Sequence, residues 1–275
     1  MTGRHFVDHR DDGVVECGNE AVEVCVVCAP SPGHPDRNED AAGVWHFADD
    51  SVVCAVADGM GGTPAGQLAA RLAIEHLDAS LRAMTREPSR RSPILDAFEN
   101  ANEAILERAP GSGTTLVVAE VVGSAVRVYN VGDSGALMVG QRGRVKLETT
   151  HHSPVGYGVA AGLIDSEKAL HHEDRHFLSN HVGSREMHIE IGSPRQQAPR
   201  DTLLVASDGL FDNVGPARVV ELVRRGRLAE CTRRLAAESF DRMGRAAERG
   251  AGGKPDDLTV VLARRRSAGR RRAAR

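Results

Sequence analysis

Four apolar runs rich in Val and Leu follow one another between residues 114 and 148, and the turns between them are only two to four residues long. Turns of this length join antiparallel neighbours, because a parallel pair needs a crossover of a dozen or more residues. We therefore expect an antiparallel β-meander. Its strands would be residues 114–122, 125–131, 135–139 and 144–148.

Strand and helix patterns alternate in blocks on either side of this meander. The pairs Thr63-Pro64 and Ser92-Pro93 each supply an N-cap and a proline at the first helical position. Further strands are expected at residues 22–28, 44–47, 51–57, 202–207 and 259–263, and further helices at 216–225 and 228–243. This order of strands, paired helices, meander, paired helices and strand predicts an α+β sandwich in one domain.

The two ends of the chain and one internal segment lack such patterns. Residues 1–20 are polar and aperiodic, so we expect a flexible extension before a domain of residues 21–263. Residues 264–275 hold seven arginines and no apolar face, which predicts a disordered basic tail. Residues 151–200 are rich in Gly, His and Pro, and we expect a long mobile segment there, with solvated histidines.

The charge distribution argues against a nucleic-acid-binding protein. The formal net charge is −3, and without the seven terminal arginines it becomes −10. No apolar run approaches the ~18 residues of a membrane helix, and the charged start is no signal peptide, so we expect a cytoplasmic protein.

The cysteines indicate neither disulfides nor a zinc site. Five cysteines, an odd number, are expected to stay reduced in the cytoplasm. Cys25 and Cys28 have the spacing of half a zinc site, but no second pair completes it. Valines stand between and beside them, which favours a strand.

Several of the apolar runs end or begin at an aspartate. Three runs lead into Asp58, Asp133 and Asp208, and Asp256 precedes the last run. A carboxylate at the end of a buried strand is costly unless something neutralises it. A single Asp-Gly pair is also an ordinary turn signal, but the repetition favours bound cations. Oxygen ligands favour Mg²⁺ or Mn²⁺, and two such ions can activate water and bind a phosphoryl group.

With these motifs in this order, the sequence resembles the metal-dependent protein phosphatase (type 2C) family in its compact bacterial form. The motifs are residues 38–40, 58–62, 113–115, 130–134, 149–153, 161–164, 206–212 and 256–260. The resemblance implies a central sandwich of two antiparallel sheets flanked by helices. It also implies a serine/threonine phosphatase that dephosphorylates phosphoproteins by attack of a metal-bridged water.

The resemblance implies which residues hold two Mn²⁺ or Mg²⁺ ions. Asp58, Asp208 and Asp256 would be the catalytic carboxylates, with Asp58 bridging both ions. The Gly59 carbonyl would be a further ligand, and Glu39 would lie on the other side through water.

Two more aspartates match supporting positions of the family. Asp133, with Asp208, matches a third and weaker metal site of bacterial members. Asp40 would hold metal-bound water.

The sequence departs from the family pattern near the expected phosphate site. Family members usually carry a phosphate-binding arginine where this chain has Pro35. Arg37 is the nearest replacement and His34 the alternative. Met60 stands where eukaryotic members have histidine, and His151 replaces a usual aspartate.

The resemblance implies phosphorylated proteins as substrates, and a cognate serine/threonine kinase or its substrates as partners of a monomer. Two alternatives remain open. One is a regulatory phosphatase with a single partner, and the other is a catalytically weak binding module on the same fold. Loss of Asp58, Asp208 or Asp256 would favour the module, and all three are present.

Overall fold

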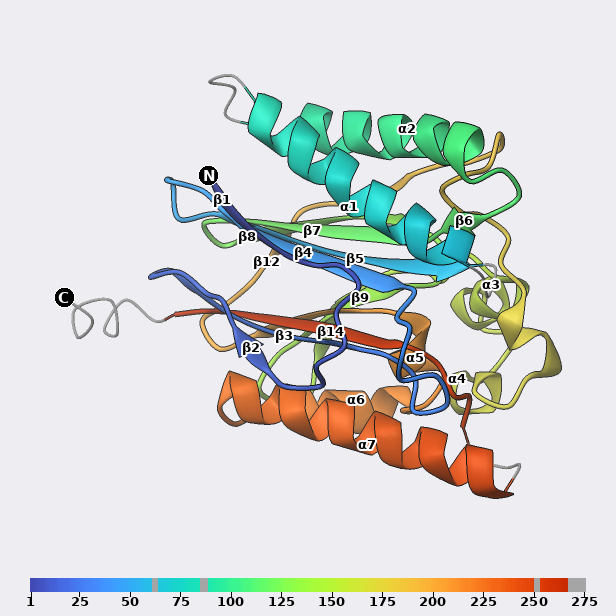
Figure 1. The fold of residues 1–275 in the computed structure, drawn as a ribbon. Helices are drawn as coiled ribbons and strands as arrows, with labels where there is room; N and C mark the ends of the chain where they lie inside the picture. The colour runs from blue at the N-terminus through green and yellow to red at the C-terminus, as the bar shows by residue number, and fades with distance from the viewer. Residues whose placement is uncertain (61–63, 85–88, 250–252, 267–275) are drawn as a thin grey trace.

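Two antiparallel sheets face each other at the centre of the computed structural model, and helices cover both outer faces (Figure 1). The structure describes residues 1–60, 64–84, 89–249 and 253–266. This arrangement confirms the α+β sandwich with flanking helices. Gly61, Gly62 and Thr63, the end of the expected glycine motif and the expected N-cap, lie outside the described residues.

The first sheet has the strand order β1-β4-β5-β7-β8-β11, and two short strands join it, β6 beside β5 and β12 beside β8. Its strands are β1 (Thr2–Phe6), β4 (Asp40–His46), β5 (Val52–Met60), β6 (Gly113–Thr114), β7 (Leu116–Val122), β8 (Ala125–Val131), β11 (Glu190–Ile191) and β12 (Arg195–Gln196).

The second sheet has the order β10-β9-β13-β14-β3-β2. Its strands are β2 (Val15–Glu16), β3 (Val22–Ala29), β9 (Gly135–Val139), β10 (Val145–Glu148), β13 (Thr202–Ala206) and β14 (Leu258–Arg265). The expected four-stranded meander is therefore wrong at its centre, because β8 and β9 belong to different sheets. Gly132, at φ +109°, begins the turn that carries the chain from one sheet to the other.

Long helices cover the outer faces of the two sheets. The helices α1 (Pro64–Ala83) and α2 (Arg91–Arg108) lie on the first sheet, and α6 (Pro216–Val223) and α7 (Leu228–Arg249) lie on the second (Figure 1). In α2 the apolar positions Ile94, Phe98 and Ile105 are fully buried. Burial of one such side chain contributes about 1.5–3 kcal/mol. The N-cap of α2 is Arg90, so the cap expected at Ser92 is wrong.

Strand β3 shows how one element serves two cores. Cys25 packs in the cluster between the second sheet and helices α6 and α7, whereas Cys28 packs in the cluster between the sheets. Successive side chains of a strand point to opposite faces of the sheet. Cys25 and Cys28 are three positions apart, an odd number, so their side chains lie on opposite faces. Both thiols are free and buried, which confirms the strand interpretation of this pair.

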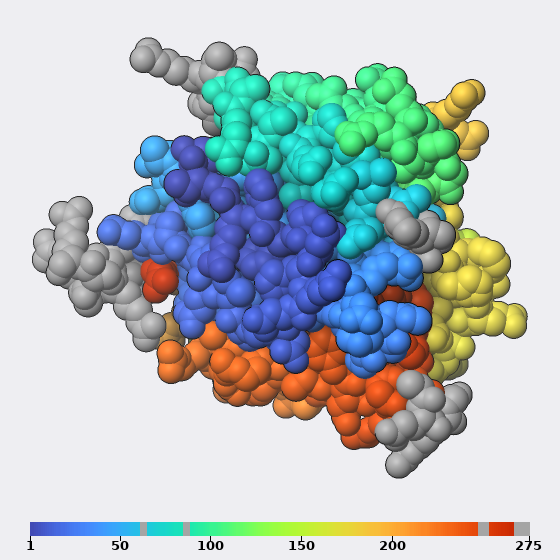
Figure 2. All heavy atoms as spheres, in the orientation of Figure 1, coloured from blue at the N-terminus to red at the C-terminus, as the bar shows by residue number. Residues whose placement is uncertain are grey.

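Both chain ends contribute to the sheets more than the sequence indicates. Strand β1 pairs with β4 along five residues, and Phe6 is buried, so part of residues 1–20 is ordered sheet. These N-terminal residues cover the middle of the face seen in Figure 2, between α1 and α7. At the other end, β14 continues to Arg265 and buries Arg264, although both were expected in the tail. Residues 267–275 lie outside the described residues.

The segment from 151 to 200 contains more regular structure than expected. It holds the helices α3 (Pro154–Ala160) and α4 (Ser166–Ala169), the 3₁₀ turn η1 (Glu173–His176), and strands β11 and β12 on the edge of β8. His152 is buried, where its Nδ1 accepts a hydrogen bond from the Gly132 amide at 3.1 Å. The expectation of solvated histidines is therefore wrong at this position. The mobility of residues 155–200 stays a prediction.

Candidate metal centre

Strand ends from both sheets meet at one end of the sandwich and line a cleft of about 470 Å³. Asp58 comes from β5, Asp133 follows β8, and Asp256 precedes β14. Asp208 begins the short helix α5 (Asp208–Phe211) directly after β13. The cleft thus gathers carboxylates that are up to 218 residues apart in the chain, since Glu39 and Asp257 both line it.

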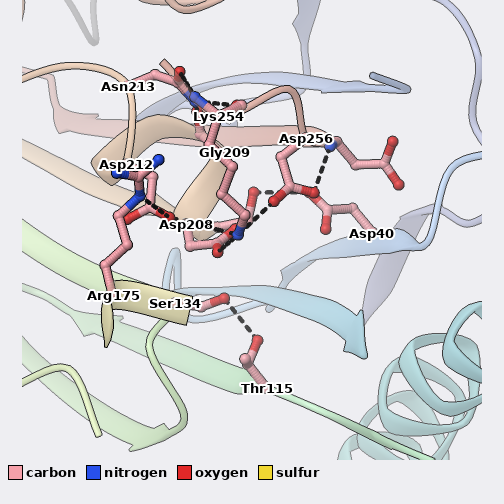
Figure 3. A network of polar contacts seen from close by, with 12 residues as sticks. Asp40, Thr115, Ser134, Arg175, Asp208, Gly209, Asp212, Asn213, Lys254 and Asp256 are labelled. Atoms are coloured by element: carbon pink, nitrogen blue, oxygen red, sulfur yellow. Dashed lines mark hydrogen bonds and ion pairs between the residues drawn. The ribbon is translucent and has the colours of Figure 1, made fainter. Parts of the chain in front are cut away.

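Hydrogen bonds to the backbone fix Asp58. The Thr115 amide donates to the Asp58 carbonyl at 2.8 Å, and the Thr114 hydroxyl donates to the same carbonyl at 2.8 Å. The Asp58 amide donates to Thr115 Oγ1 at 3.0 Å, and that hydroxyl bonds Ser134 Oγ at 2.6 Å (Figure 3). The Gly-Thr-Thr motif therefore holds the end of β5.

Gly59 lies too close to α1 to carry a side chain. A Cβ atom at this position would lie 2.2 Å from the carbonyl oxygen of Gly66. The Gly59 amide donates to the Glu39 carbonyl at 3.2 Å. The glycine after Asp58 is thus required by the close approach of α1 and the Glu39 segment.

Glu39 is positioned by an aspartate from the other sheet. Asp257 accepts from the Glu39 amide at 2.5 Å and from the Ser31 amide at 2.7 Å. Arg37 Nε lies 3.1 Å from Glu39 Oε1, and both side chains line the cleft. Arg37 therefore reaches the site, although it is offset from the usual position of the family's arginine.

Asp40 lies behind the cleft rather than in its lining. Its Oδ2 accepts a 2.7 Å hydrogen bond from Ser207 Oγ, which also accepts from the Thr259 amide. This arrangement joins β4 to β13 and β14 across the sandwich. Asp40 is 2% exposed, so its charge is almost fully desolvated.

One lysine lies among the carboxylates. Lys254 Nζ is 2.7 Å from Asp208 Oδ2 and 2.7 Å from Asp256 Oδ2. Asp212 Oδ2 lies 3.5 Å from the same ammonium and 3.9 Å from Arg175 Nε (Figure 3).

The electrostatics of the cleft show an excess of negative charge. Burial, with the charges of Asp40 and Asp208, raises the pKa of Asp58 well above its usual range. Burial and Asp208 raise the pKa of Asp133 to about 8 and the pKa of Asp256 to about 7. Burial also opposes ionisation of Asp208, but the Lys254 ammonium holds the pKa of Asp208 below its usual range.

The donor set of the cleft fits a hard divalent cation. The Oδ1 atoms of Asp40 and Asp208 are buried and have no hydrogen-bond partner among the described residues. Buried carboxylate oxygens without partners are costly unless a cation binds them. The available donors are carboxylate and carbonyl oxygens, which suit Mg²⁺ or Mn²⁺.

A second cluster of metal-capable side chains does not share these properties. Glu16, Glu23 and Cys25 have ligand atoms within 4.8 Å of one another on β2 and β3. Burial, with the charges of Glu23 and Glu16, raises the pKa of Cys25 to about 12. Only a thiolate binds metal well, so this protonated thiol makes the cluster a poor site.

The cleft brings together most of the site residues expected from the sequence, and it adds others that were not expected. Glu39, Asp58, Gly59, Asp133, Asp208, Asp256 and Arg37 line one cleft, and Asp40 lies behind it. Lys254, Asp257 and Thr115 also line the cleft and were not among the expected site residues. Asp257 is adjacent to Asp256 and Thr115 lies in a recognised motif, so both could have been found. A lysine two residues before a candidate ligand was the available signal for Lys254.

Comparisons with known proteins agree with this geometry. A family model described as protein phosphatase 2C matches residues 34–243. The serine/threonine phosphatase stp of Listeria monocytogenes is 30% identical over 241 residues, which cover 83% of this chain and 90% of that protein. The serine/threonine protein phosphatase PstP of Mycobacterium tuberculosis is 30% identical over 220 residues, covering 76% of this chain and 39% of PstP.

Solved structures give the same result. The crystal structure of Mycobacterium tuberculosis PstP superposes with a TM-score of 0.73 at 26% identity, covering 90% of this chain and 100% of that one. The catalytic domain of PstP in complex with two manganese ions gives a TM-score of 0.72 at 25% identity, covering 90% of this chain and 99% of that one.

None of the helices in the described ranges is long and apolar enough to cross a membrane.

Proposed function

The chain belongs to the protein phosphatase 2C family and is a metal-dependent serine/threonine protein phosphatase, and on that premise we propose that its cleft binds two Mn²⁺ or Mg²⁺ ions. The observation that carries this proposal is the convergence of Asp58, Asp208 and Asp256 in one cleft. Burial and neighbouring carboxylates raise the pKa of Asp58, and the Lys254 ammonium pairs with Asp208 and Asp256. The two manganese ions in the related PstP domain support the number of ions.

The ligand assignment follows the resemblance to the family and the shared cleft. Asp58, the Gly59 carbonyl, Asp208 and Asp256 would hold the two ions, with Asp58 shared between them. Glu39 would contribute through water. Their shared place in the cleft lining supports this assignment.

A third, weaker ion binds between Asp133 and Asp208. Both carboxylates line the same cleft, and burial together with Asp208 raises the pKa of Asp133 to about 8. The resemblance to bacterial family members, which have a third and weaker site at the matching positions, supports the lower affinity proposed here.

The bound ions would supply charge neutralisation for the phosphate and activation of a water nucleophile. The residues of this chain hold that arrangement in place. Thr115 and Asp257 fix the backbone of Asp58 and Glu39, and Ser207 orients Asp40 toward the back of the cleft. Arg37 lines the cleft mouth and binds the phosphate of the substrate, because a guanidinium contacts phosphate oxygens well.

Phosphoproteins are the substrates, and the finer partner assignments are proposals. We assign a cognate serine/threonine kinase, or the targets of that kinase, as the source of the phosphorylated proteins. The phosphatase domain, expected from the sequence at residues 21–263, acts as a monomer in the cytoplasm. Strand β1 and the last residues of β14 lie outside these bounds but belong to the two sheets, so the folded unit is longer at both ends.

Removal of metal tests the proposed function. Hydrolysis of p-nitrophenyl phosphate and of a phosphoserine peptide should need Mn²⁺ or Mg²⁺ and should stop in EDTA. Asp208→Asn should remove most of this activity while circular dichroism shows an intact fold. Arg233→Ala, at an exposed pair on α7, is the matched control and should keep full activity. Full hydrolysis in EDTA would contradict the proposal.

A further inference from the structure

Lys254 occupies the position of a cation in the candidate metal centre. Its ammonium lies 2.7 Å from one oxygen each of Asp208 and Asp256, and 3.5 Å from one oxygen of Asp212 (Figure 3). The side chain is 29% exposed, so the charge is largely withdrawn from water. One ammonium thus bridges two carboxylates assigned above to a divalent ion.

The backbone around Lys254 is held in place independently of its ammonium. The Lys254 amide donates to Asn213 Oδ1 at 2.9 Å, and Asn213 Nδ2 donates to the Lys254 carbonyl at 2.9 Å. Asn213 Nδ2 also donates to the Gly209 carbonyl at 2.9 Å, which ties the lysine to helix α5. This clamp directs the side chain toward Asp208, so the contact is built into the fold.

Asp208 divides its two oxygens between different environments. Its Oδ2 bonds Lys254, whereas its Oδ1 is buried and without a partner among the described residues. Asp208, Asp212 and Asp256 share this one ammonium, and Arg175 adds one guanidinium 3.9 Å from Asp212, which still leaves the group short of positive charge. The lysine therefore offsets the repulsion only in part, and a divalent ion would offset more of it.

We propose that the Lys254 ammonium is a built-in competitor of the divalent ion, a positioning residue that holds Asp208 and Asp256 together in the metal-free enzyme and must yield their oxygens when the ion binds. The inference rests on the proposed function, because it takes these two aspartates as ligands. Its consequence is a lower affinity for Mn²⁺ than the carboxylates alone would give.

Lys254→Met tests the inference, because methionine keeps most of the chain length and removes the charge. Loss of a charge-assisted contact of this kind is worth about tenfold in an equilibrium constant. The EDTA-treated and dialysed variant should bind Mn²⁺ about tenfold more tightly in a calorimetric titration. Its metal-free Tm should fall, and the rise in Tm on adding Mn²⁺ should exceed that of the wild type.

Two further variants complete the test. Lys146→Met removes another lysine paired with a buried carboxylate, Asp201, which lies at the opposite end of β13 from Asp208. It should lower the Tm equally with and without Mn²⁺ and leave the Mn²⁺ affinity unchanged. Lys254→Arg keeps the positive charge and should restore an affinity closer to the wild type than Lys254→Met does.

The outcomes separate this inference from the proposed function. Unchanged or weaker Mn²⁺ binding by Lys254→Met, with equal loss of Tm in both conditions, would show an ordinary structural ion pair and overturn the inference. Asp208→Asn tests the ligand assignment itself. If that variant binds Mn²⁺ as the wild type does, the proposed function fails at this ligand, whatever Lys254→Met shows.

Discussion

Acidic side chains outnumber basic ones among the residues discussed for the cleft. Asp58, Asp208 and Asp256 contribute negative charge at its centre, and Lys254 is already paired with two of them. A phosphate dianion that enters such a site needs a cation near the mouth. Arg37 is 39% exposed there and lies beside Glu39, so it can turn toward an incoming phosphate at small cost.

Arg37→Ala should therefore raise the KM for a phosphoserine peptide severalfold while kcat stays within about twofold. The physical reason is the loss of a charge-assisted contact with phosphate that does not involve the reacting water. Steady-state kinetics at saturating Mn²⁺ would measure both constants. Arg71→Ala, at an exposed pair on α1, is the control. An unchanged KM would mean that the metals alone bind the phosphate.

At the scale of elements, the site was more predictable than the connections. A carboxylate after a buried strand is a local signal, and the motifs for Asp58, Asp208 and Asp256 are short. The path of the chain after β8 depends on the positive φ of Gly132 and on the pairing of β9 with β13. The local sequence pattern predicts neither of them. Lys254 was missed because two of its three carboxylate partners, Asp208 and Asp212, come from another segment, and only Asp256 is its neighbour in the sequence.

Strand β14 illustrates the same limit at the C-terminus. A run of arginines reads as a solvated tail, because each side chain is charged. The sheet nevertheless buries Arg264, whose guanidinium donates to Thr202 Oγ1 at 2.7 Å and to the Gly226 carbonyl at 2.7 Å. Composition alone does not distinguish Arg264, whose guanidinium bonds buried acceptors, from the other arginines of this run.

Arg264→Ala should lower the free energy of unfolding by about 2–3 kcal/mol, because buried acceptors lose a charged donor. Urea denaturation followed by circular dichroism would measure the change. Arg245→Ala removes an exposed pair with Asp241 on α7 and should cost no more than about 0.5 kcal/mol. Equal effects of the two substitutions would show that the buried contacts of Arg264 add nothing to stability.

On the scale of the whole molecule, the site depends on how the two sheets are packed together. Asp58 belongs to the first sheet, whereas Asp208 and Asp256 flank strands of the second. Packing of the apolar cluster between the sheets therefore brings like charges together. Without bound metal, this repulsion between carboxylates destabilises the folded state. The stability of the whole domain should therefore depend on pH and on metal.

The metal-free protein should lose stability as the pH rises from 6.5 to 8. Burial and the charge of Asp208 raise the pKa of Asp212 and Asp256 to about 7 and the pKa of Asp133 to about 8. In the unfolded chain these groups titrate near 3.9, so across this window the folded state binds more protons than the unfolded state. Each group therefore lowers the free energy of unfolding by up to about 1.4 kcal/mol per pH unit while it stays protonated in the folded state. This slope fades above a pH of about 7 for Asp212 and Asp256, and above about 8 for Asp133.

Histidine titration does not obscure this slope. Burial lowers the pKa of His151 to about 4, which makes stability rise with pH, but only up to its unfolded value near 6.5. Urea denaturation between pH 6.5 and 8 should thus show a falling free energy of unfolding in EDTA. Saturating Mn²⁺ should flatten the slope, because ion binding keeps the carboxylates of the folded state deprotonated throughout. A flat or rising profile in EDTA would contradict the prediction and would mean that the cleft releases its like-charge repulsion by opening.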